Sequence, residues 1–189
     1  SAVRGGTELY RLDRALLASL DPDLIVAQDL CRVCALPSGD VQAAVEAIGC
    51  RAEVVNYDPL TLDGVLGGIE ALGRAAGARP GAQARVAALR LRLDQVRAAV
   101  AGRPQPRVLL LEWTDPPFTA GHWIPDQIVA AGGVPVLAHP GARSGATTWD
   151  AVASSGAEAL IVAPCGFDRA GAEAQLAEEQ QSETADQHD

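Results

Sequence analysis

The chain has 189 residues, a formal net charge of −9 and a hydrophobic content of 48%. This length can bury one good core or two small ones, and the negative charge argues against nucleic acid as the main partner. No stretch reaches the roughly 18 apolar residues of a membrane helix, so we expect no membrane insertion. There is no methionine, so we expect a fragment or a processed product.

The first third of the chain alternates between helical and strand-like patterns. A helical pattern over residues 12–20 precedes a short β-branched strand at 23–28. A second helix over 40–49, with Ser38 as its N-cap, leads to a second strand at 52–57. Such alternation with short connections is typical of βαβ units built around a parallel sheet.

The middle of the chain shows only helical patterns. Thr61 is expected to cap a helix over residues 61–77, and a longer amphipathic helix follows at about 82–101. Its apolar stripe consists of Val86, Leu89, Leu93, Val96 and Val100. At ~1.5 Å per residue the longer helix would extend on the order of 28 Å, which is more than a crossover needs. We therefore predict a helix that bridges two lobes, with a single sheet and an elaborate crossover as the alternative.

The last part of the chain again alternates between strand and helix patterns and ends in an acidic stretch. Its strands and helices are expected, in chain order, at residues 107–113, 124–133, 134–139, 147–156 and 159–164. Nearly continuous apolar runs predict strands buried on both faces of a parallel sheet. Residues 171–189 hold six acids and no base, and the end of this stretch is typical of a solvated helix end and a disordered tail.

These patterns predict an α/β protein with two small parallel-sheet lobes bridged by a long α-helix. The predicted divisions are an N-terminal lobe (residues 1–60), a helical segment (61–104), a C-terminal lobe (105–170) and the acidic tail (171–189). Enzyme motifs such as GxGxxG, GxxxxGK[ST], GxSxG and HExxH are missing. We therefore expect a binding protein, with no catalytic residues and no cofactor.

Unusual side chains gather after the predicted strands. They are Cys31, Cys34, Trp113, Phe118, His122, Trp123, His139, Cys165 and Phe167. The C-terminal ends of strands are where open α/β folds bind ligands. Aromatic and imidazole groups at such an edge suit a large, flat, partly apolar ligand better than a phosphate. Cys50 precedes its strand and is interpreted as a small buried hydrophobic residue.

The spacing of Cys31 and Cys34 leaves three interpretations open. The thiols can be structural or line a ligand, they can coordinate a metal, or they can form a redox dithiol. A metal set would combine them with Cys165 and with His139 or His122. A lone CxxC is a weak signal, however, and no second CxxC supports it.

The two histidines and the neighbouring tryptophan also allow two interpretations each. His122 and His139 either touch a ligand or its metal, or bond only to the protein itself. Trp123 either stacks on the ligand or covers the helix that follows it. Its position directly after Gly-His in a turn favours stacking.

Several segments together resemble a known family. They are SLDPDLIVAQDLCRVCAL, RPQPRVLLLEW with the long helix before it, TDPPFTAGHWIPDQIVAAGG and TTWDAVASSGAEALIVAPCGF, which cover most of residues 9–168. They resemble the cobalamin-type substrate-binding proteins of ABC importers, in the helical-backbone class that also takes siderophores and haem. The PPFT-x-G run and its spacing to the AGG turn are similar to the corrinoid-binding branch.

The resemblance implies a ligand held without catalysis in a cleft between two lobes. The ligand would be cobalamin, a related corrinoid or another metal chelate. Trp113, Phe118 and Trp123 would then supply stacking surface. The remaining lining residues would be His122, Phe167, Cys31, Cys34 and Cys165. A thiol and histidine metal-binding protein or enzyme is the alternative.

The resemblance also implies partners and a compartment. Acidic residues of the family dock onto the membrane permease of an ABC transporter, and Asp150 matches the C-lobe position, with Asp13 near the N-lobe position. The expected location is periplasmic or otherwise extracytoplasmic, and the expected state is a monomer. A cytoplasmic cobalamin-sensing or storage module is the alternative. The family's first strand and helix and its last strand-helix section are not matched, which again predicts a fragment.

Overall fold

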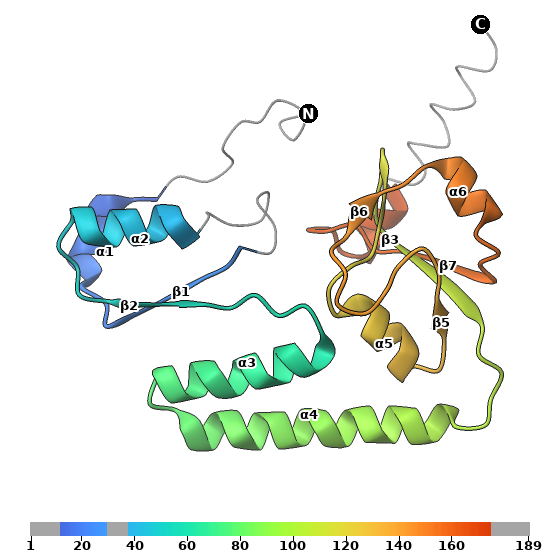
Figure 1. Ribbon diagram of the computed structural model, residues 1–189, viewed down its shortest axis with the longest axis horizontal. Helices are drawn as coiled ribbons and strands as arrows, with labels where there is room; N and C mark the ends of the chain where they lie inside the picture. Colours follow the sequence, from blue (N-terminus) through green and yellow to red (C-terminus); the bar gives the residue numbers. More distant parts are fainter. Residues whose placement is uncertain (1–11, 30–37, 175–189) are drawn as a thin grey trace, which may run out of the picture. The chain divides into compact units, whose positions relative to one another are not determined.

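The computed structural model describes residues 12–29 and 38–174 (Figure 1). The chain divides into two compact units. One comprises Ser1–Pro59 with Asp63–Arg90, and the other comprises Leu60–Leu62 with Leu91–Asp189. Each unit contains a sheet with parallel strand pairs. The α/β class expected from the sequence is therefore confirmed.

The first unit begins with a two-stranded parallel sheet and two helices. These elements are α1 (Arg14–Leu20), β1 (Leu24–Ala27), α2 (Ser38–Ala47) and β2 (Glu53–Asn56). Asp13 caps α1, since its carboxylate accepts a hydrogen bond from the backbone N–H of Leu16 at 2.9 Å. All four elements lie within the ranges that the apolar patterns predicted, apart from the start of α2.

Ser38 is the first residue of α2 and not its cap. Its backbone N–H donates to the carboxylate of Asp29 at 2.7 Å, and its hydroxyl donates to the same carboxylate. An N-cap residue precedes the first helical position, which Ser38 itself occupies, and the partner of its hydroxyl is the carboxylate of Asp29. The prediction of a Ser38 cap was therefore wrong.

The core of this sheet lies on one face. The buried residues are Ala27, Val41 and Val45, with Leu17, Ile25, Cys50 and Val54 packed against them. Cys50 thus packs as a small hydrophobic residue, with its Sγ 3.8 Å from the carbonyl oxygen of Pro22. Val26, which alternates with Ile25 and Ala27, is 53% exposed. Burial of β1 on both faces, expected from its apolar run, is therefore wrong.

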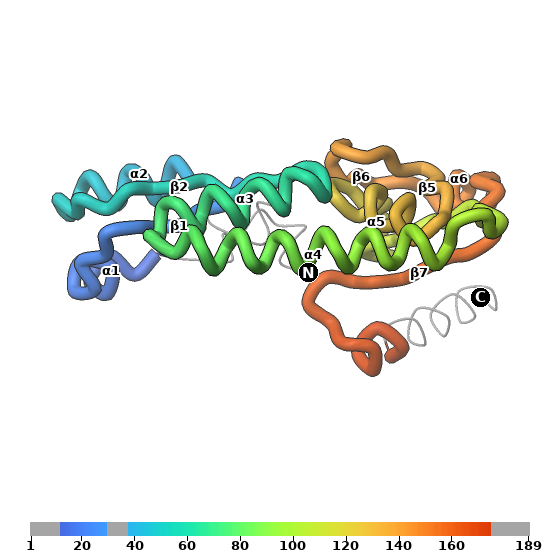
Figure 2. The backbone as a smooth tube through the Cα atoms, turned by 90° about the horizontal axis from the view of Figure 1, so that it is seen from below, coloured from blue at the N-terminus to red at the C-terminus, as the bar shows by residue number. Residues whose placement is uncertain are grey.

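Two antiparallel helices follow, α3 (Leu62–Ala75) and α4 (Arg79–Val100), and they lie side by side (Figures 1 and 2). A Cβ on Gly73 would stand only 2.2 Å from the Cβ of Ala82, so this crossing requires glycine. Val86, the first residue of the predicted stripe, is buried, whereas Val96 is 38% exposed. None of the helices in the described ranges combines the length and apolarity needed to cross a membrane.

α4 begins three residues earlier than the periodicity indicated. Pro80 stands at its second position, where the missing N–H costs nothing and the fixed φ angle favours a helix. On α3, Gly68 lies against the ring of Tyr57, whose hydroxyl donates to the carbonyl of Val65 at 3.3 Å. Burial raises the pKa of the Tyr57 phenol above its ordinary value, because the charged form would lose solvent.

Beyond α4, the described part of the second unit contains a five-stranded mixed sheet, two short helices and a helical turn at residues 169–174. The strands are β3 (Arg107–Thr114), β4 (Pro117–Thr119), β5 (Val134–Pro135), β6 (Gly145–Ala146) and β7 (Ala159–Val162), and the helices are α5 (Ile124–Ala130) and α6 (Trp149–Ser154). The strand order is β5-β3-β4-β6, with β7 also paired to β3. β5 and β7 are parallel to β3, whereas β4 is antiparallel to both β3 and β6.

Three features of this sheet differ from the expectation of a purely parallel arrangement. β4 and β6 were not predicted, because the Pro-Pro pair was interpreted as a break. Proline is tolerated at the first residue of a strand, and Pro117 occupies that position in β4. The strand expected at 134–139 ends after Pro135, and Leu137 has a φ of 56° that extended backbone does not allow.

The core of the second unit lies around β3. Leu109 and Leu111 are fully buried, Val136 is buried beside them, and Val152 and Ala157 pack against this group. β7 contrasts with this, since Leu160 is 50% exposed. Burial on both faces is therefore wrong for β7 as well, which pairs with β3 alone among the described strands.

Leu109 and Leu160 are register partners on adjacent strands and provide a matched pair of substitutions. Leu109→Ala removes a fully buried side chain and is expected to lower the free energy of unfolding by about 3 kcal/mol. Leu160→Ala, at a half-exposed position, is expected to cost less than about 1 kcal/mol. Urea unfolding followed by tryptophan fluorescence measures both, because all three tryptophans lie in the second unit. Equal losses would contradict the placement of the core.

Candidate ligand site at the ends of β3 and β7

The aromatic cluster, defined as Trp113, Phe118 and Phe167, forms at the C-terminal ends of β3 and β7. Trp113 is paired with Phe118 of β4. Its ring centroid is 6.0 Å from that of Phe167, with the planes tilted by 47°. Offset, tilted arrangements of this kind are the favoured geometry of aromatic pairs. The structure thus brings together three of the predicted site residues.

The orientation of Trp113 is fixed locally. Its indole Nε1–H donates to the carbonyl oxygen of Asp115 at 3.0 Å. The turn that follows contains the cis peptide bond between Asp115 and Pro116. Trp113 and Phe118 are both half-buried, and Phe167 is 48% exposed. The cluster therefore presents apolar ring surface to solvent while one of its rings is held in place.

A β-bulge sets the register of the cluster. Leu111 pairs with Thr119, but Trp113 pairs with Phe118, so β3 contains one residue more than β4 at this point. Glu112 is the additional residue, and its Oε1 accepts a hydrogen bond from the backbone N–H of Gly121 at 3.3 Å. Bulges commonly re-aim side chains near functional sites. Here the bulge sets which residues of β3 face Phe118.

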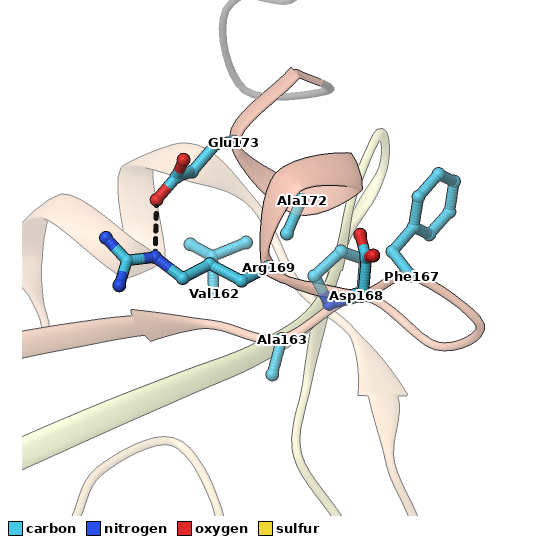
Figure 3. A pocket seen from close by; sticks show the side chains of 8 residues that line it. Val162, Ala163, Phe167, Asp168, Arg169, Ala172 and Glu173 are labelled. Atoms are coloured by element: carbon cyan, nitrogen blue, oxygen red, sulfur yellow. Dashed lines mark hydrogen bonds and ion pairs between the residues drawn. The ribbon is translucent and has the colours of Figure 1, made fainter.

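A pocket of about 360 Å³ adjoins the cluster at the end of β7 (Figure 3). It is lined by Val162, Ala163, Pro164, Phe167, Asp168, Arg169, Ala172 and Glu173. Phe167 belongs to both the pocket and the aromatic cluster. The ring surface and the pocket are therefore parts of one continuous surface of the second unit.

The charged residues of this pocket are organised by a helical turn. Residues 169–174 are helical, and Asp168 caps them by accepting from the backbone N–H of Gly171 at 2.9 Å. Arg169 Nε lies 2.7 Å from Glu173 Oε1 one turn later. Sequence reasoning missed this group, which lies at the junction with the predicted acidic tail. An aspartate cap followed by an Arg–Glu pair four residues apart was the signal that could have found it.

His122 occupies a tight turn before α5. Its φ is 56°, its backbone N–H donates to the carbonyl of Ala142 at 2.5 Å, and its carbonyl accepts from the N–H of Gly141. The Nε2 atom is buried and has no hydrogen-bond partner among the residues that the structure describes. The imidazole centroid lies 5.9 Å from that of Trp123. The two residues therefore form a local pair, in which Trp123 immediately precedes α5 without a side-chain cap.

The structure describes two of the remaining four predicted site residues. His139 and Cys165 are exposed. Cys31 and Cys34 lie outside the described residues. Within residues 12–29 and 38–174, no group of three or more His, Cys, Asp or Glu side chains is arranged to hold a metal ion. The metal set that combines these four residues stays a prediction.

The two docking candidates are both exposed acids near the start of a helix. Asp150 stands in the first turn of α6, which Thr148 caps through a bond from the N–H of Ala151 at 3.1 Å. Asp13 is engaged as the cap of α1. Both positions are accessible on the surface of their own unit. Their docking role stays a prediction.

No model of a protein family matches the sequence, and no curated protein matches it. Solved structures do match. An ABC transporter substrate-binding protein from Listeria monocytogenes superposes with a TM-score of 0.68 at 20% identity, covering 90% of this chain and 62% of its own. The chain has the fold of the helical-backbone substrate-binding proteins.

Two further matches carry ligand names. The periplasmic vitamin B12 binding protein BtuF of Vibrio cholerae has a TM-score of 0.61 at 21% identity, covering 80% of this chain and 58% of its own. IsdE of S. aureus, complexed with heme, has a TM-score of 0.70 at 15% identity, covering 90% and 64%. At these identities the likeness is one of fold, and this chain spans about three fifths of each relative's length.

Gly121 provides a test of the turn that positions His122. A Cβ on Gly121 would stand 1.9 Å from the backbone nitrogen of Ser144, so Gly121→Ala forces the two segments apart. We expect a loss of about 2–3 kcal/mol in the free energy of unfolding. Gly145→Ala in β6 is the control, because nothing lies within 4 Å of its added Cβ. Urea unfolding of both variants checks the difference, and a loss shared equally by the control would argue against the close approach.

Proposed function

We propose that this chain is part of a substrate-binding component for ABC-type uptake, and that it binds cobalamin or a related corrinoid without catalysing a reaction. The observation that carries the proposal is the aromatic cluster at the C-terminal ends of β3 and β7. Solvent-facing ring surface at this position of an α/β sheet is suited to a large macrocycle with an apolar face. The fold, shared with proteins named for vitamin B12 and heme, supports the same class of ligand.

The cluster can supply enough binding free energy for this task. Burying one aromatic side chain contributes roughly 1.5–3 kcal/mol, and a micromolar dissociation constant corresponds to about 8 kcal/mol. Three rings therefore cover much of the requirement, provided that little free energy is spent on ordering them. The hydrogen bond from Trp113 to Asp115 and the pairing with Phe118 provide such order before a ligand arrives.

Other parts of the proposal follow from the same fold. His122, Trp123 and the thiols of Cys31, Cys34 and Cys165 are proposed to contribute to the ligand's surroundings. Asp150 and Asp13 are proposed to dock onto a permease. An extracytoplasmic location is proposed because solved relatives are described as periplasmic binding proteins. These assignments extend the proposal beyond the aromatic cluster.

The test is a titration of the chain with hydroxocobalamin, followed by tryptophan fluorescence and by the visible absorbance of the corrinoid, with thiols kept reduced. Trp113→Ala is expected to weaken binding by roughly 10- to 100-fold, the equivalent of one lost aromatic contact. Trp149→Ala is the matched control. It removes an identical side chain that is 45% exposed at the start of α6 and lies outside the cluster.

The possible results separate the ligand classes. Saturable binding that Trp113→Ala weakens and Trp149→Ala leaves unchanged supports the corrinoid site. Binding of haemin without binding of hydroxocobalamin would support a macrocycle site, but it would show that the ligand is a haem and not a corrinoid. No binding of either would overturn the proposal, and stoichiometric zinc or iron in the freshly purified protein would then favour the thiol and histidine metal site.

A further inference from the structure

The pocket at the end of β7 has an unequal charge balance. Its lining contains two acids, Asp168 and Glu173, and one base, Arg169, which gives a formal charge of −1. The remaining lining residues are apolar: Val162, Ala163, Pro164, Phe167 and Ala172. An anionic group that enters this space would therefore meet a net like charge.

The single arginine of the pocket is already engaged. Its Nε lies 2.7 Å from Glu173 Oε1, and Figure 3 shows this ion pair on one side of the pocket, with Phe167 and Asp168 on the other. A guanidinium is the side chain best suited to bind a carboxylate through two parallel hydrogen bonds. Pairing with Glu173 occupies one of its donors and cancels its charge. The pocket thus contains one guanidinium that could bind an anion, and Glu173 neutralises its charge.

The ion pair contributes little to stability. The two side chains are 91% and 62% exposed and stand four residues apart on one helical turn. Exposed pairs of this type contribute only marginally to folding. Changing either partner should therefore alter the charge of the pocket while the fold is retained, which makes the pair suitable for a test of specificity.

We propose that this pocket is a charge filter that admits the neutral amide substituents of a macrocycle and disfavours carboxylate substituents, with Glu173 as the specificity-determining residue. The inference rests on the proposed function and assigns the substituent chemistry of its ligand. Phe167 connects the filter to the ring surface, because it lines the pocket and contacts Trp113. A macrocycle stacked on Phe167 would have its periphery beside the pocket that Arg169 and Glu173 also line.

The test compares two probes that differ by one charge. They are cyanocobalamin and its monocarboxylic derivative, in which one peripheral amide has been hydrolysed to the acid. The measured quantity is the ratio of their dissociation constants, acid over amide, from fluorescence titrations of the whole chain. At ionic strength on the order of 10 mM we expect a ratio above 1 that falls toward 1 at about 500 mM salt.

Two variants should move this ratio in opposite directions. Glu173→Gln removes a negative charge and releases Arg169, and it should lower the ratio by roughly two- to fivefold. Arg169→Gln leaves both acids uncompensated and should raise the ratio by a similar factor. Asp94→Asn is the matched control, since Asp94 forms the same kind of exposed pair with Arg97 and does not line the pocket. It should leave the ratio unchanged.

The results separate this inference from the proposed function. Binding of cyanocobalamin with a ratio that Glu173→Gln and Arg169→Gln do not shift would overturn the filter and leave the corrinoid site intact. A shift that Asp94→Asn reproduces would attribute the effect to overall charge and would also overturn the filter. Failure to bind either probe would overturn both. Opposite shifts in the two variants, absent in the control, support the filter.

Discussion

The pairing of β3 along both of its edges is the constraint on which the second unit depends. Leu111 pairs with Thr119 of β4 and with Val162 of β7, and Val108 pairs with Pro135 of β5 and with Ala159 of β7. Each of these neighbouring strands is four residues long or shorter. Such short strands are stable only against a longer partner whose side chains are buried. The full burial of Leu109 and Leu111 provides that anchor.

The same constraint determines where the aromatic side chains meet. β3 carries Trp113 near its end, β4 returns Phe118 to the same end, and β7 terminates beside them with Phe167 five residues further along the chain. Because β7 is parallel to β3, the two C-terminal ends lie at one edge of the sheet. The direction of the strands therefore brings these aromatic side chains to one edge of the sheet. The local sequence around each residue does not determine that they meet.

The sequence predicted the longer elements well, because their signals are local. Apolar runs located β1, β2, β3 and β7, and the heptad-like spacing located α4 to within three residues. The strands β4 and β6 could not be found in this way, since two or three residues acquire extended pairing only from a distant partner. Leu137 illustrates the converse case. Its surrounding pattern is that of a strand, but its left-handed backbone ends β5 early.

For the candidate site, the strand-end rule identified Trp113, Phe118 and Phe167 together, and the structure places these three in one cluster. It also grouped His122 and Trp123 with them, and the structure shows these two in contact with each other before α5. Arg169 and Glu173 were not identified from the sequence, because the acidic composition at the end of the chain was interpreted as a tail and not as a capped helical turn. Composition averages over a segment, while a pocket depends on individual positions.

The bulge at Glu112 means that this site is encoded partly by the pairing register of β3 and β4. In a regular ladder of the same residues, Glu112 would pair with Phe118, and Trp113 would pair with Pro117 on the opposite face of the sheet. Glu112 would then take the place of Trp113 beside Phe118 without any change in the sequence of the cluster. Residues that allow or prevent this bulge therefore matter to the site as much as the aromatic residues themselves.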